Sequence, residues 1–299
     1  MFALEELPRI PDFTERAICE LFELYASIES VQLPPQSSDA TNSSSATAPG
    51  NIFSAERGPR YLGPRALVRF FTELGVDMRS LAALAFAWLG RWQYPCHCRE
   101  EGFARGVRYA LWALDRRQHN EPRRWEQVHA TCSTLLETSI WPRESTALFE
   151  RLRSAFPDAV LSYTQRSAEA ALDFYLFAFD LNRQSPYRRS LSLTDARYLW
   201  KQFLSESCYL ATPASPGTPA GVANQPWRYL EHFDAYLESR CGMAGTIISR
   251  DTWYWVLMFA RETQVAGSSF FANYNQGDAW PVLLDGFVEY LRENKLLSS

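Results

Sequence analysis

The side chains that could support nucleophilic, acid-base or metal chemistry are few and widely spaced in this 299-residue chain. Its six cysteines and four histidines are Cys19, Cys96, Cys98, Cys132, Cys208 and Cys241, and His97, His119, His129 and His232. The Cys96 to Cys98 triplet lacks the spacing of roughly two to four residues, and the second ligand pair, of a structural zinc site. His129 and Cys132 have no further ligands nearby, and no histidine stands in a recognisable catalytic motif. The sequence therefore predicts no metal, no cofactor and no catalytic residue, and we do not expect an enzyme.

Acidic residues near the C-terminal end are arranged for binding rather than for catalysis. Asp285 and Glu289 are four residues apart, so a helix would place both on one face. The small residues Val282 and Gly286 stand beside them, which predicts two carboxylates over a shallow surface. Asp251 falls in the first turn of an expected helix, where a carboxylate interacts favourably with the helix dipole. Taken alone, these acids favour a plainer interpretation, which is a helix-start charge for Asp251 and a solvated helix face for Asp285.

Other classes of ligand find little support in the sequence. The closest approach to a calcium loop, formed by Asn273, Asn275 and Asp278, has too few carboxylates. The basic cluster at 116–124 is short and contains Glu121, and the formal net charge is -4, so no nucleic-acid partner is expected. No run approaches the roughly 18 to 20 apolar residues of a membrane span, and the first residues lack signal-peptide features. We expect no membrane partner, reduced cysteines, and a cytoplasmic and nuclear location.

Apolar residues recur at helical spacing along most of the chain, which predicts an all-α fold. The apolar stripes span residues 18–25, 67–74, 81–88, 103–114, 148–156, 196–203, 253–260 and 284–291. The stripe at 148–156 is expected to stop at Pro157. Residues 168–181 are apolar on nearly every side, which predicts a helix at the centre of the fold. Ser192 and Ser249 are expected to cap helices, and no strand-like alternation of useful length is present.

Two low-complexity segments interrupt this pattern, at about 31–55 and 211–226. Both are rich in small residues and proline and nearly free of large apolar side chains, so neither can add to a core. A further segment, at about 120–141, is also read as an addition to the compact domain. We expect residues 1–12 to form an N-terminal tail and residues 13–298 to form one helical domain with these insertions.

The segments ISRDTWYWVLMFARE and NYNQGDAWPVLLDGFVEYL resemble the end of the PONY domain of the defective-in-cullin-neddylation family. Upstream segments agree with it in order and spacing, namely LGPRALVRFFTELGVD, AFAWLGRW, REEGF, DFYLFAFDL and SLSLTDARYLW. The resemblance extends from about Phe13 to Leu297. It implies a PONY-type domain of two EF-hand-like halves without calcium. Neither the ubiquitin-binding N-terminal domain of some members nor an N-terminal glycine for myristoylation is evident.

The function implied by this resemblance is that of a scaffold-type accessory E3 for cullin neddylation. Such a protein binds the winged-helix domain at the cullin C-terminus and the N-terminally acetylated tail of the neddylation E2, and it engages the RING subunit of the cullin ligase indirectly. It promotes transfer of the ubiquitin-like modifier to a cullin lysine by orienting and concentrating its partners, without a nucleophile of its own. The alternative is a helical protein-interaction scaffold outside neddylation.

The resemblance also assigns residues to both partner sites. Its cullin-binding Asp-Ala-Asp patch falls on Asp251, Ala279 and Asp285, with Glu289 beside them, and carboxylates there would suit Lys or Arg side chains of a cullin. We expect Asp285 to be an exposed charge whose only important role is recognition. The E2-tail pocket would be lined by Leu67, Phe70, Ala83, Phe86, Cys98, Phe103 and Leu181. The alternative for these seven side chains is the ordinary core of a helical domain.

Overall fold

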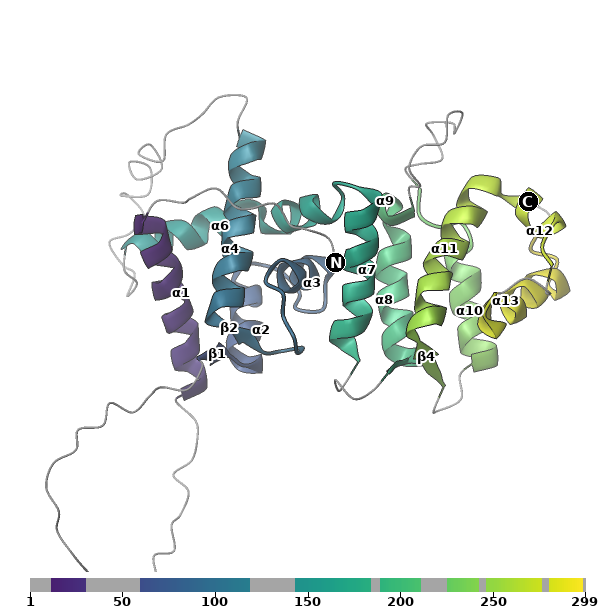
Figure 1. Cartoon of the computed structure of the whole chain (residues 1–299), viewed down its shortest axis with the longest axis horizontal. Helices are drawn as coiled ribbons and strands as arrows, with labels where there is room; N and C mark the ends of the chain where they lie inside the picture. The colour runs from purple at the N-terminus through teal and green to yellow at the C-terminus, as the bar shows by residue number, and fades with distance from the viewer. Residues whose placement is uncertain are drawn as a thin grey trace, which may run out of the picture.

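The computed structural model describes residues 12–30, 60–118, 143–183, 189–210, 225–241, 246–275 and 280–297. In these residues the all-α fold is confirmed, with two helical groups side by side along the long axis of the molecule (Figure 1). The first group contains α1 (Asp12–Ser30), α2 (Pro64–Glu73), α3 (Leu81–Leu89), α4 (Glu100–Gln118) and α6 (Arg143–Thr164). The second contains α7 (Ala168–Asn182), α8 (Leu193–Ser205), α9 (Ser207–Leu210), α10 (Leu230–Cys241), α11 (Arg250–Ala266), α12 (Ser268–Ala272) and α13 (Val282–Glu293).

Each helical group contains two helix–loop–helix units that are joined by a short antiparallel strand pair. In the first group β1 (Tyr61–Leu62) pairs with β2 (Cys98–Arg99). In the second group β3 (Ser190–Ser192) pairs with β4 (Ile247–Ser249), and Leu191 lies opposite Ile248. This arrangement agrees with the expected EF-hand-like halves. The strands were not predicted because two or three residues are too few to display an alternating pattern.

Serine side chains begin four of the helices. The hydroxyl oxygens of Ser80, Ser167, Ser192 and Ser249 accept hydrogen bonds from backbone N–H groups three residues later, at 3.0 to 3.3 Å. Such caps satisfy N–H groups that the first helical turn leaves without a partner. The capping roles predicted for Ser192 and Ser249 are therefore confirmed, and β3 and β4 each end at the residue that caps the following helix.

The helix α6 differs from the prediction because it does not stop at Pro157. It continues to Thr164 through a kink at Ala155, whose backbone is non-helical (φ -156°, ψ 29°). Proline removes one N–H group and clashes with the carbonyl four residues earlier, and a local kink accommodates both effects. Phe156 and Val160 are fully buried on either side of the proline, so the helix remains packed against its neighbours beyond the kink.

Aromatic rings fill much of the core in both groups. In the first, Phe70, Phe86 and Phe103 are fully buried, with ring centroids 5.1 to 6.0 Å apart. In the second, α7 lies next to the first group, as expected of a central helix, and contributes the buried Phe174 and Tyr175 (Figure 1). It is not buried on every side as predicted, because Leu176 and Phe177 are only half-buried. A further contact joins the groups, since the indole of Trp88 donates a hydrogen bond to the carboxylate of residue 173 at 3.1 Å. None of the helices in the described part of the chain is both long and apolar enough to cross a membrane.

Candidate protein-interaction sites

A line of aromatic rings connects the two carboxylates that the sequence singled out near the C-terminal end. Asp251 is exposed in the first turn of α11, and Trp255 stands one turn later on the same side of the helix. The ring of Trp255 meets that of Trp280 edge-on, with centroids 5.3 Å apart, and Trp280 stacks on Tyr274 at 6.3 Å. The hydroxyl of Tyr274 then donates a hydrogen bond to Asp285. We call these five residues the acid–aromatic face.

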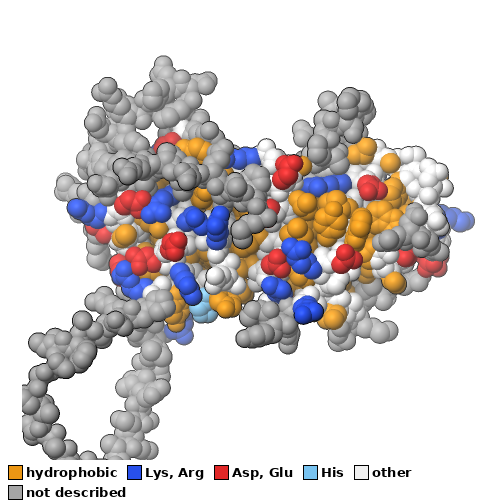
Figure 2. Space-filling view, in the orientation of Figure 1, with side chains coloured by type: hydrophobic (Ala, Val, Ile, Leu, Met, Phe, Trp, Pro, Cys, Tyr) orange, Lys and Arg blue, Asp and Glu red, His pale blue; other side chains and the backbone are white. Residues whose placement is uncertain are grey.

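The three rings of the acid–aromatic face are only half-buried, so they retain apolar surface. Figure 2 shows hydrophobic side chains gathered over the neighbouring helices α7 and α11 on the side turned to the viewer. Half-exposed residues of these helices include Leu176, Phe177, Trp255 and Met258. Tryptophan and tyrosine are common in the energetically dominant centres of protein interfaces. This end of the molecule therefore combines apolar rings with carboxylates, as a protein-binding surface requires.

The environment of Asp285 differs from the expected free charge. Its side chain is half-buried, and Oδ1 accepts a hydrogen bond from the Tyr274 hydroxyl at 2.7 Å. The carboxylate thus joins the segment before α13 to that helix, in addition to any part in recognition. Glu289, one turn later, is exposed, as is Val282 with 85% of its surface accessible. Ala279 lies outside the described residues.

Gly286 does not open a surface beside the acids, because it faces a neighbouring helix. A Cβ atom at this position would lie 2.5 Å from the hydroxyl oxygen of Tyr236 on α10. The ring of Tyr236 also contacts Phe287, with centroids 5.6 Å apart. Glycine at position 286 therefore allows α13 and α10 to approach closely, and this contact orients the acidic side of α13.

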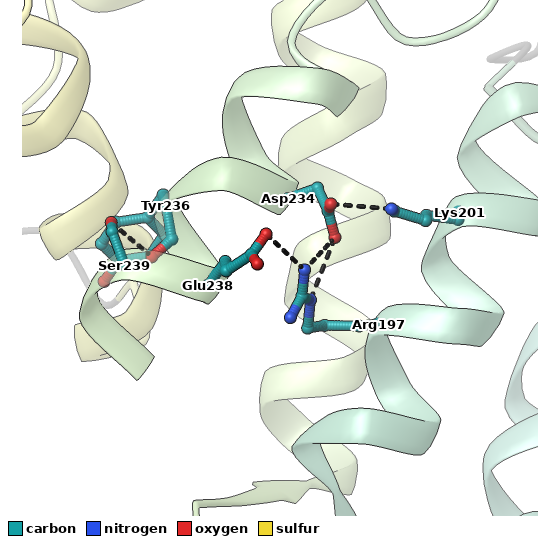
Figure 3. A network of polar contacts seen from close by, with 6 residues as sticks. All are labelled: Arg197, Lys201, Asp234, Tyr236, Glu238 and Ser239. Carbon is teal, nitrogen blue, oxygen red and sulfur yellow. Dashed lines mark hydrogen bonds and ion pairs between the residues drawn. The ribbon is translucent and has the colours of Figure 1, made fainter. Parts of the chain in front are cut away.

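A polar network that the sequence analysis missed joins α10 to α8 (Figure 3). Asp234 accepts a hydrogen bond from Arg197 Nε at 3.0 Å and pairs with Lys201 Nζ at 2.7 Å, while Glu238 lies 3.4 Å from the same guanidinium. Burial opposes ionisation of Asp234, but the hydrogen bonds from Lys201 and Arg197 outweigh it, so the pKa of Asp234 is lowered from its ordinary value. The sequence did contain a signal for this network, because Arg197 and Lys201 are four residues apart on one helix and Asp234 and Glu238 are four apart on another.

The helix α11, which carries Asp251, is held on α7 by buried contacts of Tyr175 and Trp253. Their rings stack with centroids 4.5 Å apart. The Tyr175 hydroxyl donates to the carbonyl of Trp253 at 2.7 Å, and the Trp253 indole donates to the carbonyl of Tyr175 at 3.0 Å. These contacts begin only two residues after Asp251, so they fix the direction in which the first turn of α11 presents its carboxylate.

The seven residues assigned to the E2-tail pocket do not lie together at the surface. Five of them, Leu67, Phe70, Phe86, Cys98 and Phe103, are fully buried in the aromatic core of the first group. A helical stripe at positions i, i+3 and i+4 faces the core, which leaves adjacent positions to line any cavity. The other two, Ala83 and Leu181, border a groove of about 600 Å³.

This groove, which we call the α3–α8 groove, lies between the two helical groups. Besides Ala83 and Leu181, its walls include Val68, Leu84, Ala87, Pro95, Cys96 and Leu199. Its cysteine is Cys96, whereas Cys98, two residues later in β2, points into the core and is fully buried.

Contacts between Arg79 and Tyr198 close one side of the α3–α8 groove. The guanidinium carbon lies 4.1 Å from the centre of the Tyr198 ring, and the hydroxyl of Tyr198 donates to the carbonyl of Arg79 at 3.3 Å. Gln202 donates to the same carbonyl at 3.1 Å. Because residue 79 precedes α3 and residues 198 and 202 belong to α8, these contacts hold the two walls in register.

The described residues contain no group of three or more histidine, cysteine or acidic side chains that could hold a metal ion. What the described residues present is an acid–aromatic face on one group and an apolar groove between the groups. Comparison with known proteins indicates the class. Residues 152–290 match the family model described as Cullin binding, a region that includes α7 to α12 and most of α13.

The similar proteins agree with this match. "Defective in cullin neddylation protein 1" of Cryptococcus neoformans is 33% identical over 128 residues, which cover 40% of this chain and 42% of that protein. "DCN1-like protein 3" of Xenopus tropicalis is 33% identical over 124 residues, covering 41% of this chain and 33% of that protein. "DCN1-like protein 5" of Homo sapiens is 23% identical over 229 residues, or 77% and 70% of the two chains. The chain is therefore related to the defective-in-cullin-neddylation proteins, as its motifs predicted. Its match to the first two spans less than half of their lengths.

Proposed function

We propose that this protein is a non-catalytic, scaffold-type accessory E3 for cullin neddylation. It binds a cullin winged-helix domain at the acid–aromatic face and the acetylated tail of the neddylation E2 in the α3–α8 groove. The RING subunit of the cullin ligase is engaged only indirectly. The observation that carries the proposal is the presence of two separate binding surfaces of different chemistry on one helical frame. By holding both partners, the protein raises the effective concentration of the E2 near the cullin lysine.

The acid–aromatic face suits a basic cullin surface. Asp251 is exposed, and Trp255 on the same side of α11 offers a half-buried ring as an apolar anchor. Carboxylates of this kind form charge-assisted hydrogen bonds with Arg and Lys, and such charges set the encounter rate and the register of a complex. Asp285 contributes charge at the other end of the face while its hydrogen bond to Tyr274 keeps the rings in place. On the family's pattern Ala279 would belong to the same patch.

The α3–α8 groove suits an uncharged, apolar chain end. Its volume of about 600 Å³ is in the usual range for ligand pockets, and its walls are mainly apolar, with aliphatic and aromatic side chains. The two carboxylates among its described lining residues are already engaged: Asp77 accepts from the N–H of Arg79 at 2.8 Å, and Asp195 accepts from the hydroxyl of Ser192 at 2.6 Å. Acetylation removes the charge of an N-terminal amine, and a methionine side chain fills irregular apolar space. An acetylated methionine should therefore bind better than a free amine.

No cysteine is proposed to carry the modifier. Burial raises the pKa of the Cys96, Cys98 and Cys208 thiols, which disfavours the reactive thiolate. We expect a protein in which all six cysteines are replaced conservatively to accelerate cullin modification almost as well as the parent, provided that it folds. Complete loss of acceleration on replacing one exposed cysteine in a folded protein would contradict the non-catalytic proposal.

The cullin site is tested by charge reversal with a matched control. Asp251 and Glu231 are both exposed acids in the first turn of a helix, α11 and α10 respectively. Each interacts with its helix dipole by about 0.3 to 1 kcal/mol, so Asp251→Arg and Glu231→Arg should lower the melting temperature similarly. Only Asp251→Arg should weaken binding of a cullin C-terminal domain, by about tenfold or more, as expected for close interface charge pairs. Equal affinities for the two variants would exclude Asp251 from the cullin site.

The E2 site is tested with a second matched pair. Val68 borders the groove and Val265 lies on α11 outside it, and each exposes 50% of its surface. Val68→Glu should weaken binding of an acetylated E2-tail peptide, whereas Val265→Glu should not. The parent should also prefer the acetylated peptide to the free amine. If the parent binds neither the peptide nor the cullin and does not accelerate cullin modification, the protein is a helical scaffold outside neddylation.

A further inference from the structure

A second cavity lies in the first helical group, and the interactions proposed above do not use it. It has a volume of about 780 Å³ and is bordered by the end of α3, the turn that follows, β1 and the start of α4. We call it the arginine cleft, after its lining residues Arg91, Arg99 and Arg105. Trp92 borders both this cleft and the α3–α8 groove.

The described residues of the protein do not balance the charges of the arginine cleft. Arg91 and Arg99 are exposed and Arg105 is half-buried, and none of the three makes an ion pair or hydrogen bond with a carboxylate in the described part of the chain. By contrast, Arg60 on the adjoining segment pairs with both Glu23 and Glu100. Among the described residues that line the cleft, the one acid is Glu101, against three arginines. Unpaired guanidinium groups in a concave site favour a bound anion.

Aromatic rings border the same cleft. Tyr61 stacks on His97 with centroids 5.2 Å apart and an angle of 28° between the rings. Tyr61 and Tyr94 expose 52% and 48% of their surfaces, and they are two of the six large hydrophobic residues that are most exposed in the described part of the chain. Rings as exposed as those of Tyr61 and Tyr94, next to arginines, provide a platform on which a planar group can stack.

The turn that carries Arg91 is held in an uncommon conformation. Arg91 and Cys96 have φ values of 53° and 61°, which makes them two of the three described non-glycine residues in the left-handed region. Such backbone conformations persist where surrounding contacts enforce them, and they cluster at ligand-binding segments. Here the N–H groups of Arg91 and Trp92 donate to the carbonyls of Trp88 and Ala87, both at 3.0 Å, and these hydrogen bonds close the end of α3 with Arg91 in the left-handed region. A Cβ on Gly90 would lie 2.6 Å from the carbonyl oxygen of Gly102, so this turn also packs closely against α4. The turn is therefore fixed on the start of α4, and the cleft is preformed.

We propose that the arginine cleft binds a small ligand that carries both phosphate groups and a planar ring, of the nucleotide class. Guanidinium groups bind phosphate oxygens through paired hydrogen bonds, and three of them suit a chain of phosphates better than a single one. Tyr61 and Tyr94 receive the ring. The volume of about 780 Å³ agrees with a ligand of this size and exceeds what one phosphate fills.

The test measures binding of three probes, ATP, inorganic tripolyphosphate and adenosine, to the full chain by calorimetry. ATP should bind more tightly than tripolyphosphate, and adenosine should bind weakest. The variant Arg91→Ala/Arg99→Ala should weaken ATP binding at least tenfold. Arg99→Lys should recover little of the loss, because lysine keeps the charge without the paired hydrogen-bond geometry. Tyr61→Ala should remove the advantage of ATP over tripolyphosphate.

The matched control is Arg153→Ala, which removes an exposed arginine on α6 outside the cleft and should leave ATP binding unchanged. Thermal melting of each variant separates loss of binding from loss of folding. Failure of ATP and tripolyphosphate to bind, or binding that the double variant does not alter, would overturn the anion site. Equal binding of ATP and tripolyphosphate would overturn the role of the rings. None of these measurements involves cullin or E2, so the result is independent of the proposed neddylation function.

Discussion

Replacing Tyr175 by phenylalanine would test how the three central helices of the second group are held together. The Tyr175 hydroxyl lies among α7, α8 and α11, where it accepts a hydrogen bond from the indole of Trp200 at 2.8 Å and donates one to the carbonyl of Trp253 at 2.7 Å. Burial keeps the pKa of Tyr175 well above its ordinary value, so the hydroxyl stays protonated and able to donate. Tyr175→Phe retains the stacked ring and removes only this oxygen.

The expected loss of stability depends on which hydrogen-bond partners lose the Tyr175 hydroxyl oxygen. The carbonyl of Trp253 lies inside α11, where α-helix geometry supplies a further N–H donor, so it remains satisfied. The indole N–H of Trp200 has no such substitute and is left buried without an acceptor. Leaving one buried polar group unsatisfied costs about 1 to 3 kcal/mol, and we expect the free energy of unfolding to fall by that amount.

Urea denaturation followed by circular dichroism measures this loss, with Tyr94→Phe as the control. Tyr94 is 48% exposed, so removing its hydroxyl should change the free energy of unfolding by no more than about 0.5 kcal/mol. At temperatures where Tyr175→Phe is folded, it should still bind a cullin domain because Asp251 is unchanged. If Tyr175→Phe is no less stable than Tyr94→Phe, the buried hydrogen bonds do not hold these helices together.

Three further changes test the core and the polar network. Phe86→Ala should lower stability by about 3 to 5 kcal/mol in thermal or urea denaturation, because Phe86 is fully buried among other rings. Gly106→Ala should cost about 1 to 3 kcal/mol, since its Cβ would lie 2.6 Å from the Phe86 ring. The stability lost through Gly106→Ala should be smaller in a protein that already carries Phe86→Ala, because the ring that the new Cβ meets is then absent. If the losses of the two single variants simply add in the double variant, the contact between residues 86 and 106 is contradicted. The pKa of Asp234 is lowered in the folded state, so its ionised carboxylate stabilises the fold. This stabilisation is present above the pKa of about 3.9 that an aspartate has in the unfolded chain, and it is lost as the pH falls through the folded pKa. Asp234→Asn should remove that part of the acid sensitivity in denaturation curves measured between about pH 5 and pH 2.

The core and the helix starts were predictable because both depend on local order in the sequence. Every apolar stripe that falls in the described residues forms a helix, and Leu284, Phe287 and Leu291 of the last stripe are fully buried. The caps at Ser192 and Ser249 were visible because a capping hydroxyl bonds a backbone group three residues away. The kink of α6 at Ala155 was not predictable, because proline can end or bend a helix and the choice depends on what packs beyond it.

The candidate sites were predictable only in part. Periodicity identified Phe70 and Phe86 as buried, but it could not tell core residues from the walls of a groove, which are set by how the two helical groups meet. Residue order placed Asp251 at the start of a helix, whereas the contact of Asp285 with Tyr274 depends on the path of the chain before α13.

The helices, their buried faces, their capped ends and the family resemblance could therefore be inferred from the sequence, since each is encoded by residues within a few positions of one another or by ordered motifs. Which charges are paired and which are not became known from the packing of the folded chain. Arg197 meets Asp234 from 37 positions away, while Arg91 and Arg99 meet no carboxylate in the described part of the chain. Whether an arginine is neutralised depends on which helix packs beside it, and that contact is made across space rather than along the chain.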